Sequence, residues 1–398
     1  FDATKTPAIY VPTGQEAAYQ TAWSAYAGSI GEYMNCGADA MAVYDAASHT
    51  LTICGKGAMT DLSSAADQPW KSLQGQLQTV SFEPFITAIG TNAFSGCSAL
   101  TAAKIEGTAT TIADGAFDGN ATGRRIFVPV SAITGYGESA YLADIYSVGQ
   151  CGAEGSDVSW ELNAKSMALS ISGTGAMTDY ASNSNVPWYS VCGKITSATI
   201  AEGVTSVGNY AFYSCSSMAT VSIPDGVTTI SSNLFNGCTS LTAITIPDGV
   251  TSINSSAFRS CSKLESITLP ASVTSVYNYA FRDCSMLTEV NIFAPSLQTY
   301  GSNAFQNTPA DLKIYVPAAS VDTYKAGWSA YADKFVALPY YALTMKEGTQ
   351  DADKWTVKVG EAEKTVTLPI TNVKKGETVT LKYNGRLKVK GVKATVNP

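Results

Sequence analysis

The side chains that could perform catalysis are few in this chain. It contains one histidine, His49, which the local pattern places at a hairpin turn. Without a second histidine a histidine-based metal cluster cannot form, and a Ser–His–Asp triad would have to use His49, which we expect to be solvated. No glycine-rich phosphate-binding motif opens a helix. We therefore predict no catalytic residue, no metal and no cofactor, and hence a protein that is not an enzyme.

Nine cysteines offer the next chemistry, because thiols bind metals and form disulfides. None has the C-x-x-C spacing that is typical of zinc sites. Five occupy one position of a repeated block, at which Asn120 and Thr308 also occur, and we expect them to be buried thiols that act as small apolar side chains. For the other four, a disulfide between Cys36 and Cys54, or between Cys151 and Cys192, stays open. The five repeat cysteines are Cys97, Cys215, Cys238, Cys261 and Cys284.

Carboxylates are more numerous, with 32 Asp and Glu against 25 Lys and Arg. Asp351 and Asp353 resemble the start of a calcium-binding loop, but the glycine and the terminal glutamate of that motif are missing. A pair of facing acids could hydrolyse glycosides, yet only Glu289 is acidic among the ten outward strand positions considered below. We expect neither calcium binding nor acid–base catalysis.

The element that must position these residues is a block that recurs along the chain with its phenylalanines in register. In an early copy, Phe94 and Phe117 stand one block apart, and we call the distance along the chain from Phe94 to Phe117 the repeat interval. A period of this length predicts a solenoid, in which successive turns stack to bury one continuous core. Later in the chain, phenylalanines follow one another at this same interval, except that the last is one residue further on: Phe212, Phe235, Phe258, Phe281 and Phe305.

One block, residues 241–263, reads LTAITIPDGVTSINSSAFRSCSK. Its first residues have the L-x-x-L-x-L spacing of leucine-rich repeats, and the alternating T-x-I segment predicts a short strand. Pro247 should end that strand, and an Asp-Gly turn follows. Stacked turns of this kind would form a parallel sheet. The residues expected to face the interior are Leu241, Ile244, Ile246, Val250, Ile253, Ala257, Phe258, Cys261 and Leu264.

If the apolar strand residues face inward, the alternate positions must face outward. Two outward columns carry mostly short polar side chains, and we interpret one as a candidate binding strip. Tyr277 and Tyr279 flank the Ala-Phe position of one repeat without recurring periodically, and they are candidates for an exposed aromatic patch, with Tyr300 one turn later. The alternative for the strip is a set of ordinary soluble strand residues, and the alternative for the tyrosines is a structural edge. The strip consists of Thr199, Ser222, Thr245, Thr268 and Asn291, and the second column of Ser197, Thr220, Ala243, Ser266 and Glu289.

The repeats occur in two arrays with related segments at both ends. Each array opens with a predicted hairpin and a Pro-Trp pair, at residues 69–70 and 187–188, which we expect to cap the first turn. Each closes with a Val-Pro pair that a tyrosine follows. In the second closing segment Tyr324, Trp328 and Tyr331 should lie on one face of a short helix that covers the last turn.

The closing segment also stands at residues 7–30, with Tyr19, Trp23 and Tyr26, although no repeats precede it. We therefore expect that the chain begins inside a longer protein, and that this segment either docks on the first array or is loosely held. Four regions result. They are a closing-segment remnant over residues 1–30, a first capped array over 31–148, a second capped array over 149–338, and a small β domain over 339–398.

Residues 339–398 contain no repeat. The segments WTVKVG, KTVTLPI, ETVTLKYNG and LKVKGVKATV predict strands joined by turns. Eleven Lys and Arg against six Asp and Glu make this region basic, whereas the rest of the chain is acidic. We interpret the basic surface as a solvated face; the alternative is a contact with the cell wall, an anionic glycan or the acidic arrays.

The blocks resemble the BspA-type leucine-rich repeat family of surface proteins from anaerobic bacteria. The resemblance rests on GVTSVGNYAFYSCSSMATVSIP and GVTSINSSAFRSCSKLESITLP, which are similar to the family consensus, and it extends over most of residues 31–338. It implies a β-rich leucine-rich-repeat solenoid with few helices. It also implies a secreted or surface protein that binds host proteins or other cells.

Composition excludes some other functions. Only 14% of the residues are charged, against roughly 25% in ordinary globular domains, and the net charge is −7. Binding to nucleic acid is therefore not expected, and no apolar run is long enough to cross a membrane. We predict an exported, extracellular or cell-surface protein that binds a host or bacterial surface protein or a glycan. The alternative is a stalk that carries another functional domain; the oligomeric state is not predicted.

Overall fold

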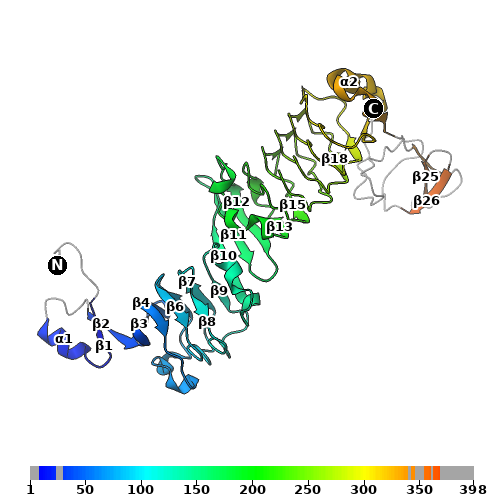
Figure 1. The fold of residues 1–398 in the computed structure, drawn as a ribbon. Coiled ribbons are helices and arrows are strands. Elements are labelled where there is room, and N and C mark those ends of the chain that lie inside the picture. Colours follow the sequence, from blue (N-terminus) through cyan, green and yellow to red (C-terminus); the bar gives the residue numbers. More distant parts are fainter. Residues whose placement is uncertain (1–8, 24–29, 339–341, 346–353, 360–361, 368–398) are drawn as a thin grey trace. The chain divides into compact units, whose positions relative to one another are not determined.

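The computed structural model describes residues 9–23, 30–338, 342–345, 354–359 and 362–367. These residues form mainly strands, turns and short 3-10 segments, with two α helices, α1 (Glu16–Ala22) and α2 (Val321–Gly327). The predicted β-rich fold with few helices is therefore confirmed. The chain divides into two compact units, the first made of Phe1–Thr174 and Ser184–Ala201 and the second of Gly175–Asn183 and Glu202–Pro398. Figure 1 labels their main elements.

In the first unit the strands pair in the order of the chain. From β4 to β10 the main sheet gains one parallel strand per turn, and a second ladder joins β4, β6 and β8. Antiparallel pairs flank this array, β2–β3–β4 before it and β10–β11–β12 after it, so β10 both closes the array and begins a hairpin. The strands are β1 (Ile9–Pro12), β2 (Ile30–Asn35), β3 (Gly37–Asp45), β4 (Thr50–Met59), β5 (Thr79–Phe82), β6 (Ile86–Ile89), β7 (Ala102–Ile105), β8 (Thr111–Ile112), β9 (Arg125–Phe127), β10 (Ile145–Gln150), β11 (Asp157–Asn163), β12 (Ala168–Ala176) and β13 (Ser197–Ile200).

In the second unit two parallel sheets run along the array, β16–β17–β19–β21 and β18–β20–β22–β23. A separate antiparallel sheet, β24–β25–β26, follows. Two of the strands predicted after residue 339 are therefore confirmed; the predicted strands beyond residue 368, and Asp351 and Asp353, lie outside the described residues. The strands are β14 (Val204–Ser206), β15 (Thr220–Ser222), β16 (Thr229–Ile230), β17 (Ser252–Ile253), β18 (Ser266–Leu269), β19 (Ser275–Val276), β20 (Glu289–Ile292), β21 (Thr299–Tyr300), β22 (Lys313–Val316), β23 (Phe335–Ala337), β24 (Ala342–Met345), β25 (Lys354–Val359) and β26 (Ala362–Thr367).

The repeat phenylalanines form a stack in each unit. The rings of Phe94 and Phe117 lie 5.5 Å apart between centroids, with 15° between their planes. From Phe212 to Phe305 the four successive distances lie between 5.3 and 5.6 Å and the angles between 2° and 16°. Every one of these rings is at most 1% exposed. The predicted stacking of turns on aligned aromatic side chains is confirmed.

The strand predicted within residues 241–247 is wrong. No strand forms there, and Ile244 is half-buried rather than buried. Leu241 and Ile246 still fill the interior, at 0% and 6% exposure, and the Glu265 amide donates to the Thr242 carbonyl at 3.3 Å. Side-chain burial therefore holds this turn in the stack although its backbone ladder is incomplete. The other residues predicted to face the interior of this block are 0% exposed.

The Ala-Phe segment of each repeat carries an inter-turn ladder of its own, outside the sheets. Left-handed residues stand two positions before and two positions after the phenylalanine, for example Ser256 and Ser260, both with φ of 58°. This conformation points their amides along the stack. Ser256, Phe258 and Ser260 donate to carbonyls one turn ahead at 3.1, 2.8 and 2.8 Å. The remaining left-handed residues of this kind include Tyr210, Ser214, Asn233, Gly237, Tyr279 and Asp283.

The repeat cysteines bear buried thiols, as predicted, and none of the nine cysteines forms a disulfide. The Sγ atoms of Cys261 and Cys284 each donate to the phenylalanine carbonyl of the preceding repeat, at 3.1 Å. Asn120 does the same with its amide, which donates to the Phe94 carbonyl at 2.7 Å. The position therefore selects a side chain that can donate to this carbonyl, which explains why asparagine can take the place of cysteine there.

The predicted caps cover the ends of the arrays. At the start of the first array Trp70 is 1% exposed and stacks on Phe94 at 5.0 Å. At the end of the second array Tyr324, Trp328 and Tyr331 are buried, as predicted. Tyr324 lies in α2, while Trp328 ends that helix and Tyr331 lies in the 3-10 segment after it, so the helix is shorter than the aromatic face.

Glycine should be preferred at the left-handed positions that serine occupies. An L-residue there costs about 1 kcal/mol relative to glycine, so Ser260→Gly should raise the free energy of unfolding by about this amount. Gly237→Ala, at the equivalent position, should lower it, because φ is 79° and the new Cβ would lie 3.3 Å from Ser214 Cα. Urea unfolding checks both. Ser262→Gly, outside these positions, should not stabilise, and a stabilisation there would contradict the explanation.

The buried thiols should make stability fall at alkaline pH. Burial raises the pKa of Cys284 from 9.0 to about 12, so its contribution to stability is complete below pH 9 and is lost as pH rises toward 12, because only the unfolded thiol ionises. Between pH 8 and pH 10 the parent should lose about 1.4 kcal/mol more than Cys284→Ser, whose hydroxyl keeps a donor. Equal losses in urea unfolding would contradict this assignment.

Candidate functional site

The strand positions selected as a binding strip fall in both units. Thr199 lies in β13 of the first unit, opposite Ser170 of β12, and it is exposed. In the second unit Ser222 and Thr245 are exposed, and Thr268 is half-buried. These side chains are short and uncharged. They offer hydroxyl groups that can donate and accept hydrogen bonds while little side-chain entropy is lost on contact.

Asn291 departs from the predicted strip. It pairs in register with Thr268 on one side and Tyr315 on the other, as the strip requires, but it is only 4% exposed. Its Nδ2 donates to Glu289 Oε1 at 2.7 Å. The amide is therefore engaged within its own strand, and of the strip residues in the second unit Ser222, Thr245 and Thr268 are the accessible ones.

The two selected tyrosines differ in their surroundings. Tyr277 is 40% exposed. Tyr279 is half-buried, has a φ of 62°, and lies under the Arg282 guanidinium, which is 5.1 Å from the ring centroid. Arg282 also pairs with Asp283 at 3.3 Å. Tyr277 is thus the accessible aromatic side chain of this pair.

Tyr300 does not extend an exposed patch, contrary to the prediction. Its ring lies 5.8 Å from Tyr324 and 5.2 Å from Trp328, in edge-to-face contacts. Its hydroxyl accepts a hydrogen bond from the Leu297 amide at 3.0 Å. Tyr300 therefore anchors the closing cap of the second array.

Near these tyrosines, the Asp283 carboxylate binds side chains from its own repeat and from both neighbouring repeats. A hydrogen bond from Asn307 Nδ2 at 2.7 Å, followed by the charges of Arg282 and Arg259, lowers the pKa of its carboxyl group. Arg259 lies 3.4 Å from the same carboxylate. Both guanidinium groups pair with this one carboxylate, so the cluster carries one uncompensated positive charge.

Sequence reasoning missed Phe85, a large apolar side chain that is 72% exposed. Its carbonyl accepts a hydrogen bond from Gly57 at 2.9 Å, and in the second unit the carbonyl of Gly203 accepts one from Gly175 at 3.0 Å. The backbone role is thus the same without a side chain, so the turn does not require phenylalanine. The sequence signal that could have revealed Phe85 is its departure from the other repeats, which have glycine at the equivalent positions 203, 226 and 249.

Phe85 borders a shallow hollow of about 710 Å³ on the opening cap of the first array. Tyr33 and Met41 contribute apolar surface, and Asn35, Asp39 and Lys56 contribute polar groups. Lys56 Nζ lies 3.9 Å from the Asp39 carboxylate, and both side chains are largely exposed. An exposed pair of this kind contributes little to stability, so both groups are available to a ligand.

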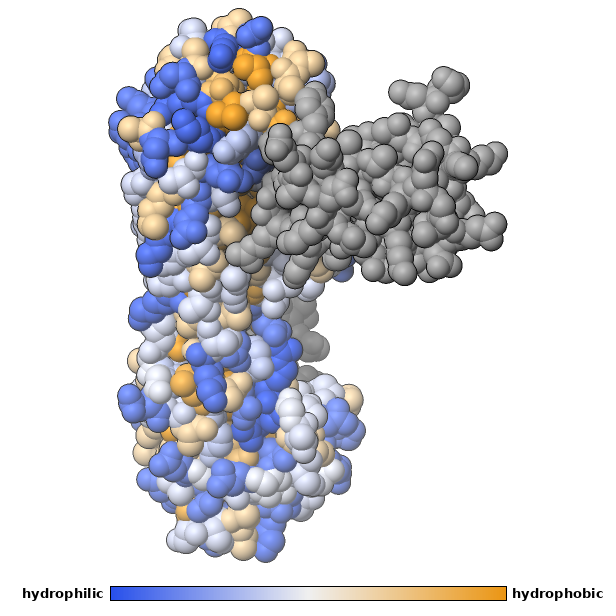
Figure 2. Space-filling view, turned by 90° about the vertical axis from the view of Figure 1, so that its right-hand side faces the viewer, coloured by the Kyte–Doolittle hydropathy of each residue, from blue (hydrophilic) through white to orange (hydrophobic). Residues whose placement is uncertain are grey.

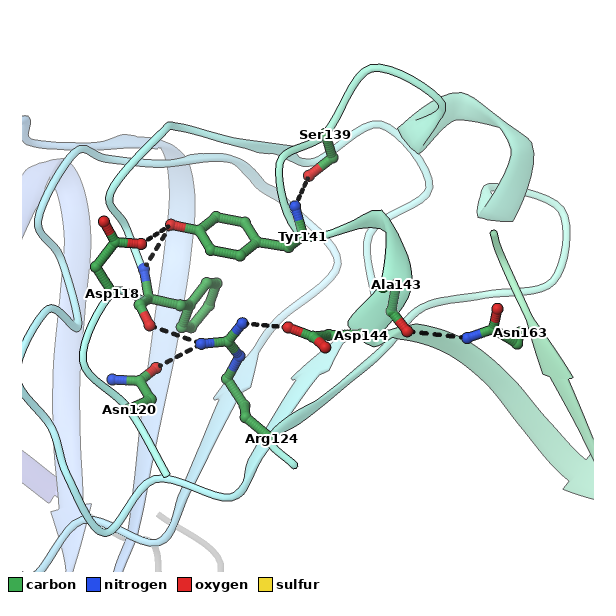
Figure 3. A network of polar contacts seen from close by, with 9 residues as sticks. Asp118, Asn120, Arg124, Ser139, Tyr141, Ala143, Asp144 and Asn163 are labelled. Atoms are coloured by element: carbon green, nitrogen blue, oxygen red, sulfur yellow. Dashed lines mark hydrogen bonds and ion pairs between the residues drawn. The ribbon is translucent and has the colours of Figure 1, made fainter. Parts of the chain in front are cut away.

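The polar network around Arg124 has a structural role (Figure 3). The Arg124 side chain, 10% exposed, donates to the Phe117 carbonyl at 2.6 Å and pairs with Asp144. Its guanidinium carbon lies 5.4 Å from the Phe117 ring centroid and 5.0 Å from that of Tyr141. The Tyr141 hydroxyl donates to Asp118 and accepts from the Phe117 amide. This network covers the last ring of the first array.

His49 lies at the hairpin turn between β3 and β4, as predicted, with a φ of 50°. It is half-buried rather than fully solvated, and its Nδ1 lies 2.9 Å from the Tyr44 hydroxyl. Within the described part of the chain no cluster of three His, Cys, Asp or Glu could hold a metal ion. No described helix is long and apolar enough to span a membrane.

The face shown in Figure 2 mixes hydrophilic, near-neutral and hydrophobic residues. This pattern agrees with the low content of charged residues, 14% of the chain. Contacts with such a surface would rely on hydrogen bonds and aromatic side chains more than on charge.

Solved structures of bacterial leucine-rich repeat proteins are similar to this chain. A leucine-rich cell surface protein of Faecalibacterium prausnitzii is 19% identical, covers 65% of this chain and 94% of its own, and has a TM-score of 0.29. A leucine-rich repeat protein of Eubacterium ventriosum is 20% identical, covering 70% and 95%, with a TM-score of 0.22. The pneumococcal vaccine antigen PcpA is 15% identical, covering 66% and 68%, with a TM-score of 0.31. These likenesses are too low to establish a function or a location.

A search of curated proteins gave no match. The family model for the BspA-type leucine-rich repeat region matches this chain in six copies, over residues 72–144 and 186–312, which together make up half of the chain. These ranges contain every phenylalanine of the two stacks. The chain belongs to the BspA-type leucine-rich repeat family.

Proposed function

We propose that this protein is an exported surface protein that binds a host or bacterial surface protein or a glycan. The observation that carries the proposal is the exposure of Ser222 and Thr245 at equivalent positions of successive repeats, where the apolar residues on either side of each are half-buried or buried. A stacked core holds such side chains at a fixed spacing of about 4.8 Å from turn to turn. The surface is therefore ordered before a ligand arrives, which reduces the entropy cost of binding.

Each contact on this surface would be weak. A neutral hydrogen bond contributes about 1 kcal/mol net, so a single hydroxyl cannot hold a partner. Several contacts in register raise the affinity, and several copies on one cell raise it further through avidity. The proposed mechanism is accordingly repeated weak docking on a rigid scaffold, without chemical conversion of the partner.

The hollow beside Phe85 is a second point of contact in the same proposal. An exposed aromatic face next to amide and charged groups suits a sugar ring, or an aromatic side chain of a partner protein. Phe85→Gly is a clean probe of this contact, because Gly203 shows that the turn tolerates glycine.

A stalk that carries a separate functional domain is the competing proposal. The continuous ring stacks support it, because each array is held along its length by an uninterrupted core. The two proposals differ in one respect: a stalk needs no ligand on its surface.

Arginine at two strip positions should weaken binding. The full chain, displayed in many copies, is first screened against matrix proteins and glycans to find its strongest partner. We expect Ser222→Arg/Thr245→Arg to lower the affinity for that partner at least about tenfold. Two bulky charged side chains would cover the hydroxyl surface without touching the core. Surface plasmon resonance measures the affinity, and thermal unfolding checks that the fold is intact.

The matched control is Thr228→Arg/Thr251→Arg, at two exposed positions directly before β16 and β17. This variant should bind like the parent. Equal losses in both variants would show that the strip is not the contact surface. Absence of any partner in the multivalent screen would contradict the binding function and favour the stalk.

A further inference from the structure

The closing segment of the second array, at α2, has a counterpart among the described residues at α1. The residues before α1 and α2 have nearly the same backbone, with φ and ψ of −106° and −8° at Gln15 and −105° and −5° at Ser320. In both helices the tryptophan at the C-terminus, Trp23 or Trp328, donates its amide to a tyrosine carbonyl four residues earlier, at 2.7 and 2.8 Å. Residues 9–23, the described part of the cap at α1, therefore have the same helix-end geometry as the cap at α2.

The strands of the two caps agree as well. β1 pairs in parallel with β2, with Ile9 opposite Ile30, and β22 pairs in parallel with β23, with Ile314 opposite Phe335. The other edge of β22 pairs with β20, where Val290 lies opposite Ile314. Among the described strands, β2 is the partner of β1, and the second edge of β1 is unpaired. An unpaired strand edge is a template for another strand.

The two caps differ in how far their aromatic side chains are buried. Trp328 is 2% exposed; it lies edge-on to Phe305 at 5.2 Å and donates its ring N–H to the Gly301 carbonyl at 2.9 Å. Trp23, its counterpart, is 48% exposed. Tyr19 and Tyr10, in α1 and β1, are 37% and 47% exposed. Among the described residues, β1 and α1 thus combine three exposed large aromatic side chains with an unpaired strand edge, a surface that is costly to leave in water.

We infer that β1 and α1 dock on the last turn of a leucine-rich-repeat array, joined directly in front of them as residues 289–312 are joined in front of β22. A strand of that turn would pair in parallel with β1, as β20 pairs with β22. Its repeat phenylalanine would pack under Trp23, as Phe305 packs under Trp328. The occupant is identified by this internal precedent, since the same side chains in the same geometry cover a repeat turn in the second unit.

A second copy of the chain fits this surface less well. The last ring of the first array, Phe117, is covered by Tyr141 at 5.7 Å, and the last ring of the second array, Phe305, is covered by Trp328 and Tyr331. Neither described array therefore offers an open final turn to another molecule.

Extension of the chain tests the inference. A copy of residues 145–312 is placed directly before Ala8, so that it ends in an uncapped turn, and hydrogen exchange is followed by mass spectrometry over residues 9–23. We expect the amides of β1 to exchange at least about 100-fold more slowly in the extended chain than in the original chain. The control is the same extended chain with Tyr19→Ser/Trp23→Ser, which should lose this protection while β5 to β9 keep theirs.

Two results would overturn the inference. The first is equally fast exchange of residues 9–23 with and without the added array. The second is protection of the original chain that grows with protein concentration and disappears in Tyr19→Ser/Trp23→Ser, because this would show that a second copy is the occupant. Neither result depends on whether the hydroxyl strip binds a partner.

Discussion

Each repeat phenylalanine lies flat on the next, and this contact sets the distance between turns throughout the two stacks. Burial of the ring provides most of the energy, since removal of a buried phenylalanine costs about 3–5 kcal/mol. The stacking geometry adds about 0.5–1.5 kcal/mol per pair. The ladder of amides around the Ala-Phe segment and the thiols that donate to phenylalanine carbonyls keep the rings at a uniform spacing of 5.3 to 5.6 Å in the second unit. The ends of a stack must then be covered by other aromatic groups, as Trp70 and Trp328 do.

Much of this architecture can be predicted from the sequence, because one constant repeat interval fixes which side chains meet from turn to turn. Phe258, Cys261 and Leu264 are all buried as the pattern requires. The strand predicted over residues 241–247 does not form, because strand propensity describes single residues, whereas a strand also needs regular backbone hydrogen bonds to a neighbouring strand. The left-handed positions were missed for a related reason. Serine, asparagine, aspartate, tyrosine and glycine all occur there, so no residue type marks them.

The surface is less predictable than the core. The alternation of apolar and polar residues correctly predicts that Ser222 and Thr245 are exposed, but exposure also depends on partners that periodicity does not reveal. Asn291 is covered by its own strand environment, and Tyr300 is covered by the closing cap. Phe85 shows the reverse case, in which a departure from the repeat reveals an exposed side chain that the turn does not need. Departures from a repeat are therefore the better guide to contact sites.

Removal of one whole turn tests the central claim most directly. Deletion of residues 247–269 takes out one complete repeat, including Phe258, and leaves Phe235 and Phe281 separated by the repeat interval. The account predicts that this shortened chain still unfolds cooperatively in urea, with the strand-rich circular dichroism spectrum of the parent. Deletion of residues 247–258 removes the same phenylalanine but breaks the interval, and it should abolish the transition of the second unit. Equal damage from both deletions would contradict the claim that in-register ring stacking organises the protein.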